Sequence, residues 1–240
     1  MEERVRRLSG RVALVVGGAS DLGRAVARRL AAEGAAVSVA DARPQAASET
    51  CRLAEAAGGR ARLIRAAPAR LPDAARMVAE TVDFFGRLDI LFAAVLPAGK
   101  GGVADVEAEA WEQEVAAALQ GVVLVSKHAV PAMRRSGGGS VVFAVPGAEH
   151  RLLGELAVPS SVGAAVAQGA VVGLARSMAA AHGPEGIRVN CVCVGPTGAP
   201  SAAEKALEAA ASAVLFLASE ESSLVTGAVL SVGGGQGVSL

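Results

Sequence analysis

Along the chain, short apolar runs that indicate strands alternate with segments whose apolar residues recur at helical spacing. The apolar run "VALVV" leads through a glycine turn into a segment whose apolar residues recur at helical spacing, and "AAVSVADAR" follows as a second strand. Later helices are expected at 44–57, 71–85, 105–135, 159–182 and 201–218, and later strands at 61–66, "LDILFAAV", "SVVFAV", "IRVNCVCV" and "AVLSV". Such alternation predicts a parallel sheet of about seven strands covered on both faces, a doubly wound Rossmann-type α/β fold in a single domain spanning residues 1–240.

The helix expected at 159–182 carries almost no polar chemistry. No charged residue occurs from Leu156 to Ala175. A membrane span needs about 20 mostly apolar residues, but this run contains Pro159 and Gln168 and lacks the Leu, Ile and Phe density that favours insertion. The chain opens with the charged "MEERVRRLSG", which is not a secretory signal. We therefore expect a cytoplasmic protein that does not contact a membrane.

Charge and cysteine content narrow the function classes further. The 23 basic and 23 acidic residues balance, which gives no electrostatic reason to expect a nucleic-acid partner. Three cysteines, Cys51, Cys191 and Cys193, form no framework, and the Cys-x-Cys pair lies in an apolar strand, so buried thiols are expected and no metal site. The chain has no tyrosine, and Asn190 is its only asparagine.

The first glycine turn is the strongest sign of a nucleotide site. Gly17 and Gly23 bracket a loop that opens a helix, where free backbone N–H groups and the helix dipole attract a pyrophosphate. Asp41 ends the next strand, where an acid can bond the ribose hydroxyls of NAD and repel the extra phosphate of NADP. A tight turn followed by an ordinary capping acid is the alternative interpretation.

The chain resembles the classical short-chain dehydrogenase/reductase (SDR) family over nearly its whole length. "VALVVGGASDLGRAVA" is similar to that family's cofactor loop, and "GRLDILFAAV" to its fourth strand. "GGGSVVFAV", "GPEGIRVNCVCVGPTGAP", "AVLFLAS" and "VTGAVLSVGGG" match later landmarks in order. The resemblance implies the Rossmann fold and a hydride-transfer site that uses an Asn, a Ser, and a Tyr and Lys in Tyr-x-x-x-Lys.

That catalytic set is not found at the matching positions. Ala164 stands at the Tyr position and Gln168 at the Lys position, Ala118 replaces the Asn, and Pro146 is the nearest match to the Ser. Methyl and amide groups have no accessible pKa with which to shuttle protons. From these replacements we expect no catalytic residues and a chain that is not an enzyme on its own.

The resemblance also implies a weakened cofactor and substrate site. Asp21 replaces a loop glycine, where it suits the helix dipole but lies close to an incoming pyrophosphate. The remaining family positions are occupied by Ala67, Ala93, Ala94, Val95, Leu96 and Ala199. Pro200 runs almost directly into the helix at 201–218, so the usual substrate lid is expected to be missing. We expect no cofactor, and NAD rather than NADP if one binds, with Gly17, Gly23 and Asp41 as vestigial contacts.

These observations favour a non-catalytic subunit that supports an active NAD-dependent SDR chain in a hetero-oligomer, a tetramer by analogy with the family. A hydroxyacyl-CoA is one candidate substrate for that partner. The helices near 105–135 and 159–182 are the expected interface, because small residues allow close helix approach. The small residues are Gly163, Ala167, Gly169, Ala170 and Gly173.

Two alternatives remain open at this point. The segment "PGAEHRLLGE" brings Glu149, His150 and Arg151 near the site, and a histidine beside an acid can catalyse a non-redox step. The other alternative is an NAD(H)-sensing protein that uses the residual glycine loop.

Overall fold

Seven parallel strands form the centre of the protein in the computed structural model, which describes residues 6–94, 102–146, 161–195 and 203–233. The strand order is β3-β2-β1-β4-β5-β6-β7, and every neighbouring pair is parallel. The strands are β1 (Val12–Val16), β2 (Ala36–Asp41), β3 (Arg60–Arg65), β4 (Ile90–Ala94), β5 (Gly139–Pro146), β6 (Ile187–Val194) and β7 (Val229–Val232). The predicted doubly wound α/β fold is confirmed.

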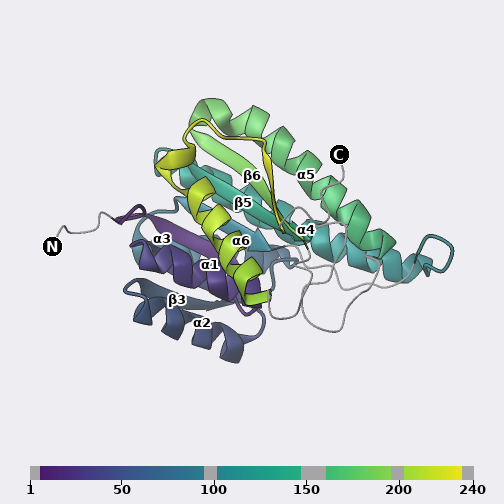
Figure 1. Cartoon of the computed structure of the whole chain (residues 1–240), viewed down its shortest axis with the longest axis horizontal. Coiled ribbons are helices and arrows are strands. Elements are labelled where there is room, and N and C mark those ends of the chain that lie inside the picture. Colours follow the sequence, from purple (N-terminus) through teal and green to yellow (C-terminus); the bar gives the residue numbers. More distant parts are fainter. Residues whose placement is uncertain (1–5, 95–101, 147–160, 196–202, 234–240) are drawn as a thin grey trace.

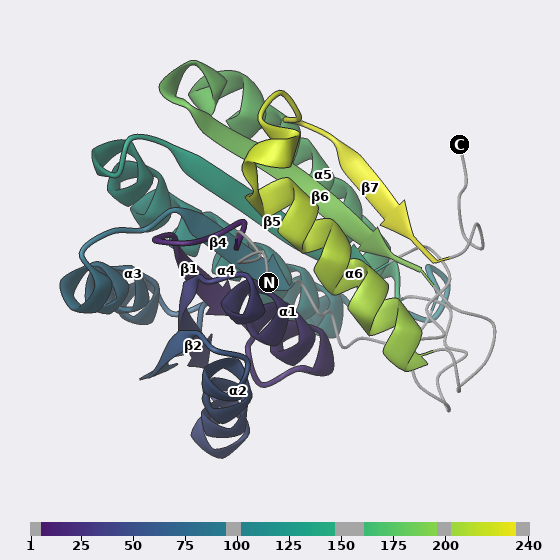
Figure 2. The same ribbon diagram turned by 60° about the vertical axis from the view of Figure 1, so that its left-hand side comes forward.

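Helices cover both faces of this sheet (Figures 1 and 2). One layer contains α1 (Asp21–Ala32), α2 (Pro44–Ala56) and α6 (Ala203–Ala218), and the other contains α3 (Leu71–Phe85), α4 (Ala108–Arg135) and α5 (Val162–His182). Short 3₁₀ turns, η1 (Gly183–Glu185) and η3 (Glu220–Ser222), follow α5 and α6. The two layers enclose two separate apolar cores, one on each side of the sheet.

Side chains of each strand alternate between the two cores. In β1, Leu14 and Val16 face the layer of α3, α4 and α5, while Ala13 and Val15 face the opposite layer. All four are buried. A parallel strand buried on both faces needs a continuous apolar run, which is why "VALVV" shows no polar alternation.

The expected bounds hold within three residues, and the largest differences lie at helix N-termini. Helix α5 begins at Val162 instead of 159, because Ser161 caps it: the Ser161 Oγ accepts a hydrogen bond of 3.0 Å from the Ala164 backbone N–H. Helix α4 begins at Ala108 instead of 105. Residues 196–202 lie outside the described residues, so the missing lid stays a prediction.

The bare helix α5 buries one side only. Its buried residues recur every three or four positions toward the sheet: Gly163, Ala164, Ala167, Val171, Ala175, Met178 and Ala179. By length and composition, 108–135 and 162–185 could each cross a membrane, but 39% of the most apolar window of each is buried inside the protein. Core helices of this kind pass the same test, so the finding is weak evidence for a membrane span.

A buried carboxylate fixes the amino-terminal edge of the sheet. Asp89, 2% exposed, accepts a hydrogen bond of 2.9 Å from the Val12 backbone N–H through Oδ2. Its two oxygens also pair with the Arg87 guanidinium at 2.8 and 2.5 Å, and Oδ1 lies 3.2 Å from Arg11 Nη1. One side chain therefore holds the start of β1 beside the start of β4.

Replacing Asp89 by Asn should destabilise the fold by about 1–3 kcal/mol, because hydrogen bonds to an ionised group are lost while their donors stay. Urea unfolding followed by circular dichroism measures the loss. Glu109→Gln, at an exposed position of α4, is the control and should change the unfolding free energy by less than about 0.5 kcal/mol. Equal midpoints for the two variants would contradict a structural role for Asp89.

Candidate functional site

The glycine turn between β1 and α1 has the geometry of a phosphate loop. Gly17 has φ +80°, which a residue with a side chain rarely adopts. A Cβ on Gly23 would lie 2.3 Å from the Gly17 carbonyl oxygen, so the first turn of α1 packs directly on the loop backbone. The Thr50 hydroxyl, fully buried on α2, donates a 2.7 Å hydrogen bond to the Gly18 carbonyl and fixes the loop from the other side.

Asp41 joins this loop to the carboxyl end of β2. Its Oδ2 accepts a 3.0 Å hydrogen bond from the Ala19 backbone N–H, and its Oδ1 accepts from the Arg43 backbone N–H at 2.9 Å and from Arg43 Nε at 3.2 Å. Burial raises the pKa of Asp41, but the hydrogen bonds from Arg43 and Ala19 outweigh burial and hold the pKa below its usual value. The three cofactor residues predicted from the sequence therefore lie around one loop, with Gly17 in the loop, Gly23 in the first turn of α1 and Asp41 at the end of β2.

Asp21 lies at the start of α1 and is paired with Arg24, whose Nη1 is 3.3 Å from the Asp21 Oδ1. The Asp21 side chain is 49% exposed. Both observations soften the repulsion expected from its charge, since a partner cation and water screen it. In the first turn of α1, the Gly23 N–H donates a 3.0 Å hydrogen bond to the Ser20 Oγ, which caps the helix.

The family's four catalytic positions lie on α4, β5 and α5. Ala164 is 6% exposed, and Ala118 is half-buried against the core shared by α4 and α5. Gln168 is half-buried, and its Nε2 lies 3.7 Å from Cys193 Sγ at the end of β6. Pro146 ends β5, where it is aligned with Val194 of β6. That none of the four is catalytic stays a prediction.

A carboxylate and a hydroxyl that the sequence reasoning missed lie beside these positions. Glu114 of α4 and Ser161, the cap of α5, are hydrogen-bonded, with the Ser161 Oγ 2.5 Å from Glu114 Oε1. Two signals were available: Glu114 precedes Ala118 by one helical turn, and a serine directly before an apolar helix is a typical cap.

Other residues singled out in the sequence have structural partners. Asn190 is fully buried, donates to the Val225 carbonyl at 2.9 Å and accepts from the Ala228 N–H at 3.0 Å, so it ties β6 to the segment before β7.

Burial raises the pKa of the Cys51 thiol to about 11 and that of the Cys191 thiol to about 12. The part of the chain that the structure describes has no cluster of three or more metal-ligating side chains. Several predicted positions lie outside the described residues: Val95, Leu96, Glu149, His150, Arg151, Ala199 and Pro200.

Comparison with known proteins decides the family. The model of the short chain dehydrogenase family matches residues 11–210. The chain belongs to the SDR family. It is 33% identical to cis-4-hydroxycyclohexanecarboxylate dehydrogenase of Sinomonas cyclohexanicum, over 94% of this chain and 96% of the relative. It is also 33% identical to 2,5-dichloro-2,5-cyclohexadiene-1,4-diol dehydrogenase of Sphingobium indicum, over 95% and 97% of the two chains.

A solved SDR structure extends this likeness to three dimensions. The crystal structure of a short chain dehydrogenase from Mycobacterium paratuberculosis bound to NAD superposes with a TM-score of 0.82. The two sequences are 29% identical, and the match covers 94% of this chain and 97% of that one. From the sequence we expect no cofactor, and NAD rather than NADP if one binds. The relative's structure contains NAD, which agrees with the second expectation and gives no support to the first.

The expectation of a non-catalytic subunit that is not an enzyme on its own is wrong. Relatives matching almost the whole chain are named dehydrogenases, which points to a catalytic oxidoreductase. That expectation rested on the four replaced side chains, on the weakened cofactor contacts and on the missing lid. Holding the reactants in the right geometry contributes a large part of the catalytic effect in many enzymes, independently of these side chains.

The pKa of Asp41 predicts how stability depends on pH. Asp41→Asn should lower the unfolding free energy at neutral pH by about 1–3 kcal/mol. Because the folded pKa lies below the usual 3.8, the contribution of the carboxylate is present above that value and is lost as pH falls through the folded pKa. The difference between wild type and variant should therefore be constant above about pH 5 and shrink below pH 3.8.

Urea titrations of both proteins across this range measure the difference. A gap that widens toward acid pH would contradict the assignment of these hydrogen bonds to an ionised Asp41.

Proposed function

We propose that this SDR chain is an NAD-dependent oxidoreductase that oxidises a secondary alcohol on a six-membered carbon ring, or reduces the matching ketone. The observation that carries the proposal is the loop at the carboxyl edge of the sheet. Gly17 and Gly23 keep the backbone approach that a dinucleotide needs, and Asp41 holds the loop beside the end of β2. The full-length likeness to named dehydrogenases supports the same reaction class.

NAD is the dinucleotide that the residues fit. The Asp41 carboxylate is ionised at neutral pH and lies where the ribose of the adenosine half is held in this fold, so a 2′-phosphate would meet a negative charge. Arg43 pairs with Asp41 and lessens that repulsion without removing it, since its side chain is 65% exposed to water.

The ring alcohol is inferred from two relatives. Both are named for substrates that carry a hydroxyl group on a six-membered ring. The half-buried Ala118, at one of the family's catalytic positions, suits the body of such a ring, because a hydrocarbon surface is best covered by apolar groups.

Dinucleotide binding supplies the hydride acceptor or donor. The chain positions the substrate carbon beside it and excludes water, which the two helices and the carboxyl edge of the sheet can do without a tyrosine. Oxidation also releases one proton from the hydroxyl oxygen, and that proton has to be taken up by a group other than the missing tyrosine.

The purified chain should oxidise cis-4-hydroxycyclohexanecarboxylate with NAD⁺ at a turnover on the order of 1 per second or above, the lower end of the usual enzyme range. NADH absorbance follows the reaction, and cyclohexanecarboxylate, which has no hydroxyl group, is the substrate control. NAD⁺ should exceed NADP⁺ by about tenfold in kcat/KM, equivalent to about 1.4 kcal/mol of discrimination. No turnover with any ring alcohol would overturn the proposal.

A matched pair of glycine variants links that activity to the loop. Gly23→Ala puts a methyl group 2.3 Å from the Gly17 oxygen and should abolish NAD⁺ binding in calorimetry. Gly169→Ala on α5 meets open space and should leave binding unchanged.

We also propose that the chain associates with a second SDR-family subunit through α4 and α5, and that the complex is a heterotetramer. The outward sides of these helices carry the exposed apolar side chains of Val123 and Val166, 46% and 43% exposed. Gly169 and Gly173 leave open space one helical turn apart on α5, which permits a close approach by another helix. Gly163 and Ala167 are buried within the chain and do not belong to this surface.

Gly173→Glu should shift the assembly to a smaller species, because it puts a carboxylate into an apolar contact at a cost of several kcal/mol. Light scattering after gel filtration, on the chain alone and on the complex purified from its host, measures the change. Ala209→Glu at an exposed position of α6 is the control and should leave the mass unchanged. An unchanged mass for both variants would rule out this interface.

A further inference from the structure

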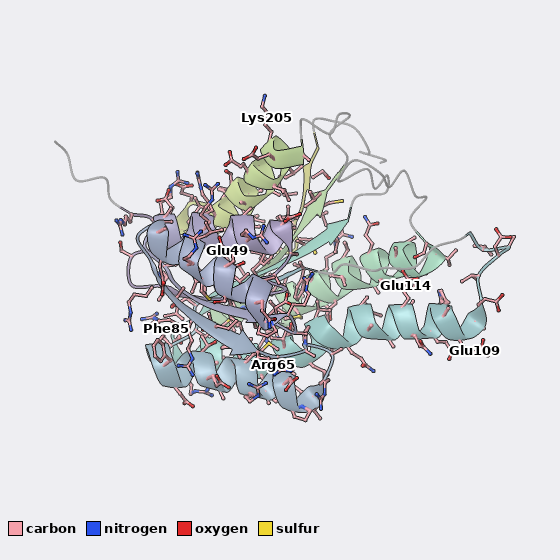
Figure 3. The ribbon with its side chains drawn as sticks, turned by 90° about the horizontal axis from the view of Figure 1, so that it is seen from below. Glu49, Arg65, Phe85, Glu109, Glu114 and Lys205 are labelled. Atoms are coloured by element: carbon pink, nitrogen blue, oxygen red, sulfur yellow. The ribbon has the colours of Figure 1, made fainter. Side chains whose placement is uncertain are left out.

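Glu114 is directed from α4 toward the first turn of α5 (Figure 3). The Ser161 hydroxyl donates to Glu114 Oε1 at 2.5 Å and accepts from the Ala164 N–H at 3.0 Å. One short hydrogen-bonded chain therefore runs from the backbone at the family's Tyr position, through a hydroxyl, to a carboxylate on the neighbouring helix.

Gly163 makes the space that this carboxylate occupies. A Cβ at Gly163 would lie 2.2 Å from Glu114 Oε2 and 2.7 Å from its Cδ. The predicted use of Gly163 for close contact with a partner helix is therefore replaced by an internal one.

The pair also lies on the faces that carry the vacant catalytic positions. Glu114 and Ala118 are one turn apart on α4, and Ser161 is followed by the buried Ala164 in the first turn of α5. Both helices reach beyond the carboxyl ends of the strands, where ligands bind in open parallel sheets (Figure 3). Ala118, Ala164 and Gln168 have no group that titrates near neutral pH.

We propose that Glu114 and Ser161 are the acid–base pair of this site and take up the proton of the substrate hydroxyl. The proposal rests on the oxidoreductase function above. In the oxidation, the hydride leaves the ring carbon with both bonding electrons for the nicotinamide, and the C–O bond becomes a carbonyl. The hydroxyl proton passes to Ser161 Oγ as the Ser161 proton passes to Glu114 Oε1, and reduction reverses both transfers.

Exposure of the two groups matches such a path. Ser161 is 2% exposed, whereas Glu114 is half-buried. Of the pair, the carboxylate is the more exposed, and it connects the hydroxyl to solvent, where the proton is released after turnover.

Glu114→Gln is the decisive variant, because the amide oxygen still accepts the Ser161 hydrogen bond but takes up no proton. General acid–base catalysis contributes about 10²–10⁴-fold, so kcat should fall by about 100-fold or more, with KM changed by less than about threefold. Glu114→Asp keeps an ionisable group and should recover part of kcat. Glu112→Gln, an exposed neighbour on α4, is the matched control and should retain wild-type kcat.

Three further measurements separate proton transfer from structure. The wild-type pH–rate profile should have a limb of falling activity toward acid pH that the profile of Glu114→Gln lacks. Gly163→Ala should displace the carboxylate and lower kcat, while circular dichroism shows an intact helix content. Infrared difference spectra between acid and neutral pH should contain a carboxyl band that disappears in Glu114→Gln, independently of turnover.

The outcomes distinguish this inference from the proposed function. An active wild type with equal kcat in Glu114→Gln would overturn the acid–base role and leave the oxidoreductase standing. No NAD-dependent turnover by the wild type would overturn both. A fall in kcat with an unchanged acid limb would assign Glu114 to packing alone and also overturn the inference.

Discussion

The close approach of the α1 backbone to the loop after β1 is the constraint on which the rest of the site depends. Gly23 packs against the Gly17 carbonyl at a distance that no Cβ can enter. That contact sets the start of α1 beside the loop after β1, where the Ser20 hydroxyl caps the helix by accepting from the Gly23 N–H. Thr50 and Asp41 then hold the loop from α2 and β2.

Two buried carboxylates serve the two ends of the sheet in different ways. Asp89 at the amino-terminal edge is surrounded by Arg11 and Arg87 and fixes β1 beside β4. Asp41 at the carboxyl edge has mainly backbone N–H partners and fixes the loop beside β2. Replacing either carboxylate would leave its hydrogen-bond donors without a partner. Asp41 therefore stabilises the fold, whatever part it also has in binding a ligand.

The apolar replacements at the family's catalytic positions and the full-length likeness to dehydrogenases lead to different expectations. The positions at Ala118, Ala164 and Gln168 describe one route for a proton, whereas hydride transfer depends on the placement of cofactor and substrate. Loss of that route does not remove the reaction class. The proton then needs another acceptor, and the hydrogen-bonded pair of Glu114 and Ser161 is the acceptor that we propose.

The sequence by itself determined the strand–helix order, the two-sided burial of the sheet and the loop of Gly17, Gly23 and Asp41, because apolar periodicity and glycine positions are local properties of the chain. Only the tertiary structure placed Glu114 of α4 against Ser161 and Gly163 of α5, since this contact joins residues 47 positions apart in the sequence. It also separated the small residues of α5 into an inner set and an outer set. Helical spacing identifies a face, but the packing of α4 and the sheet decides which face is covered and what fills the space beside a glycine.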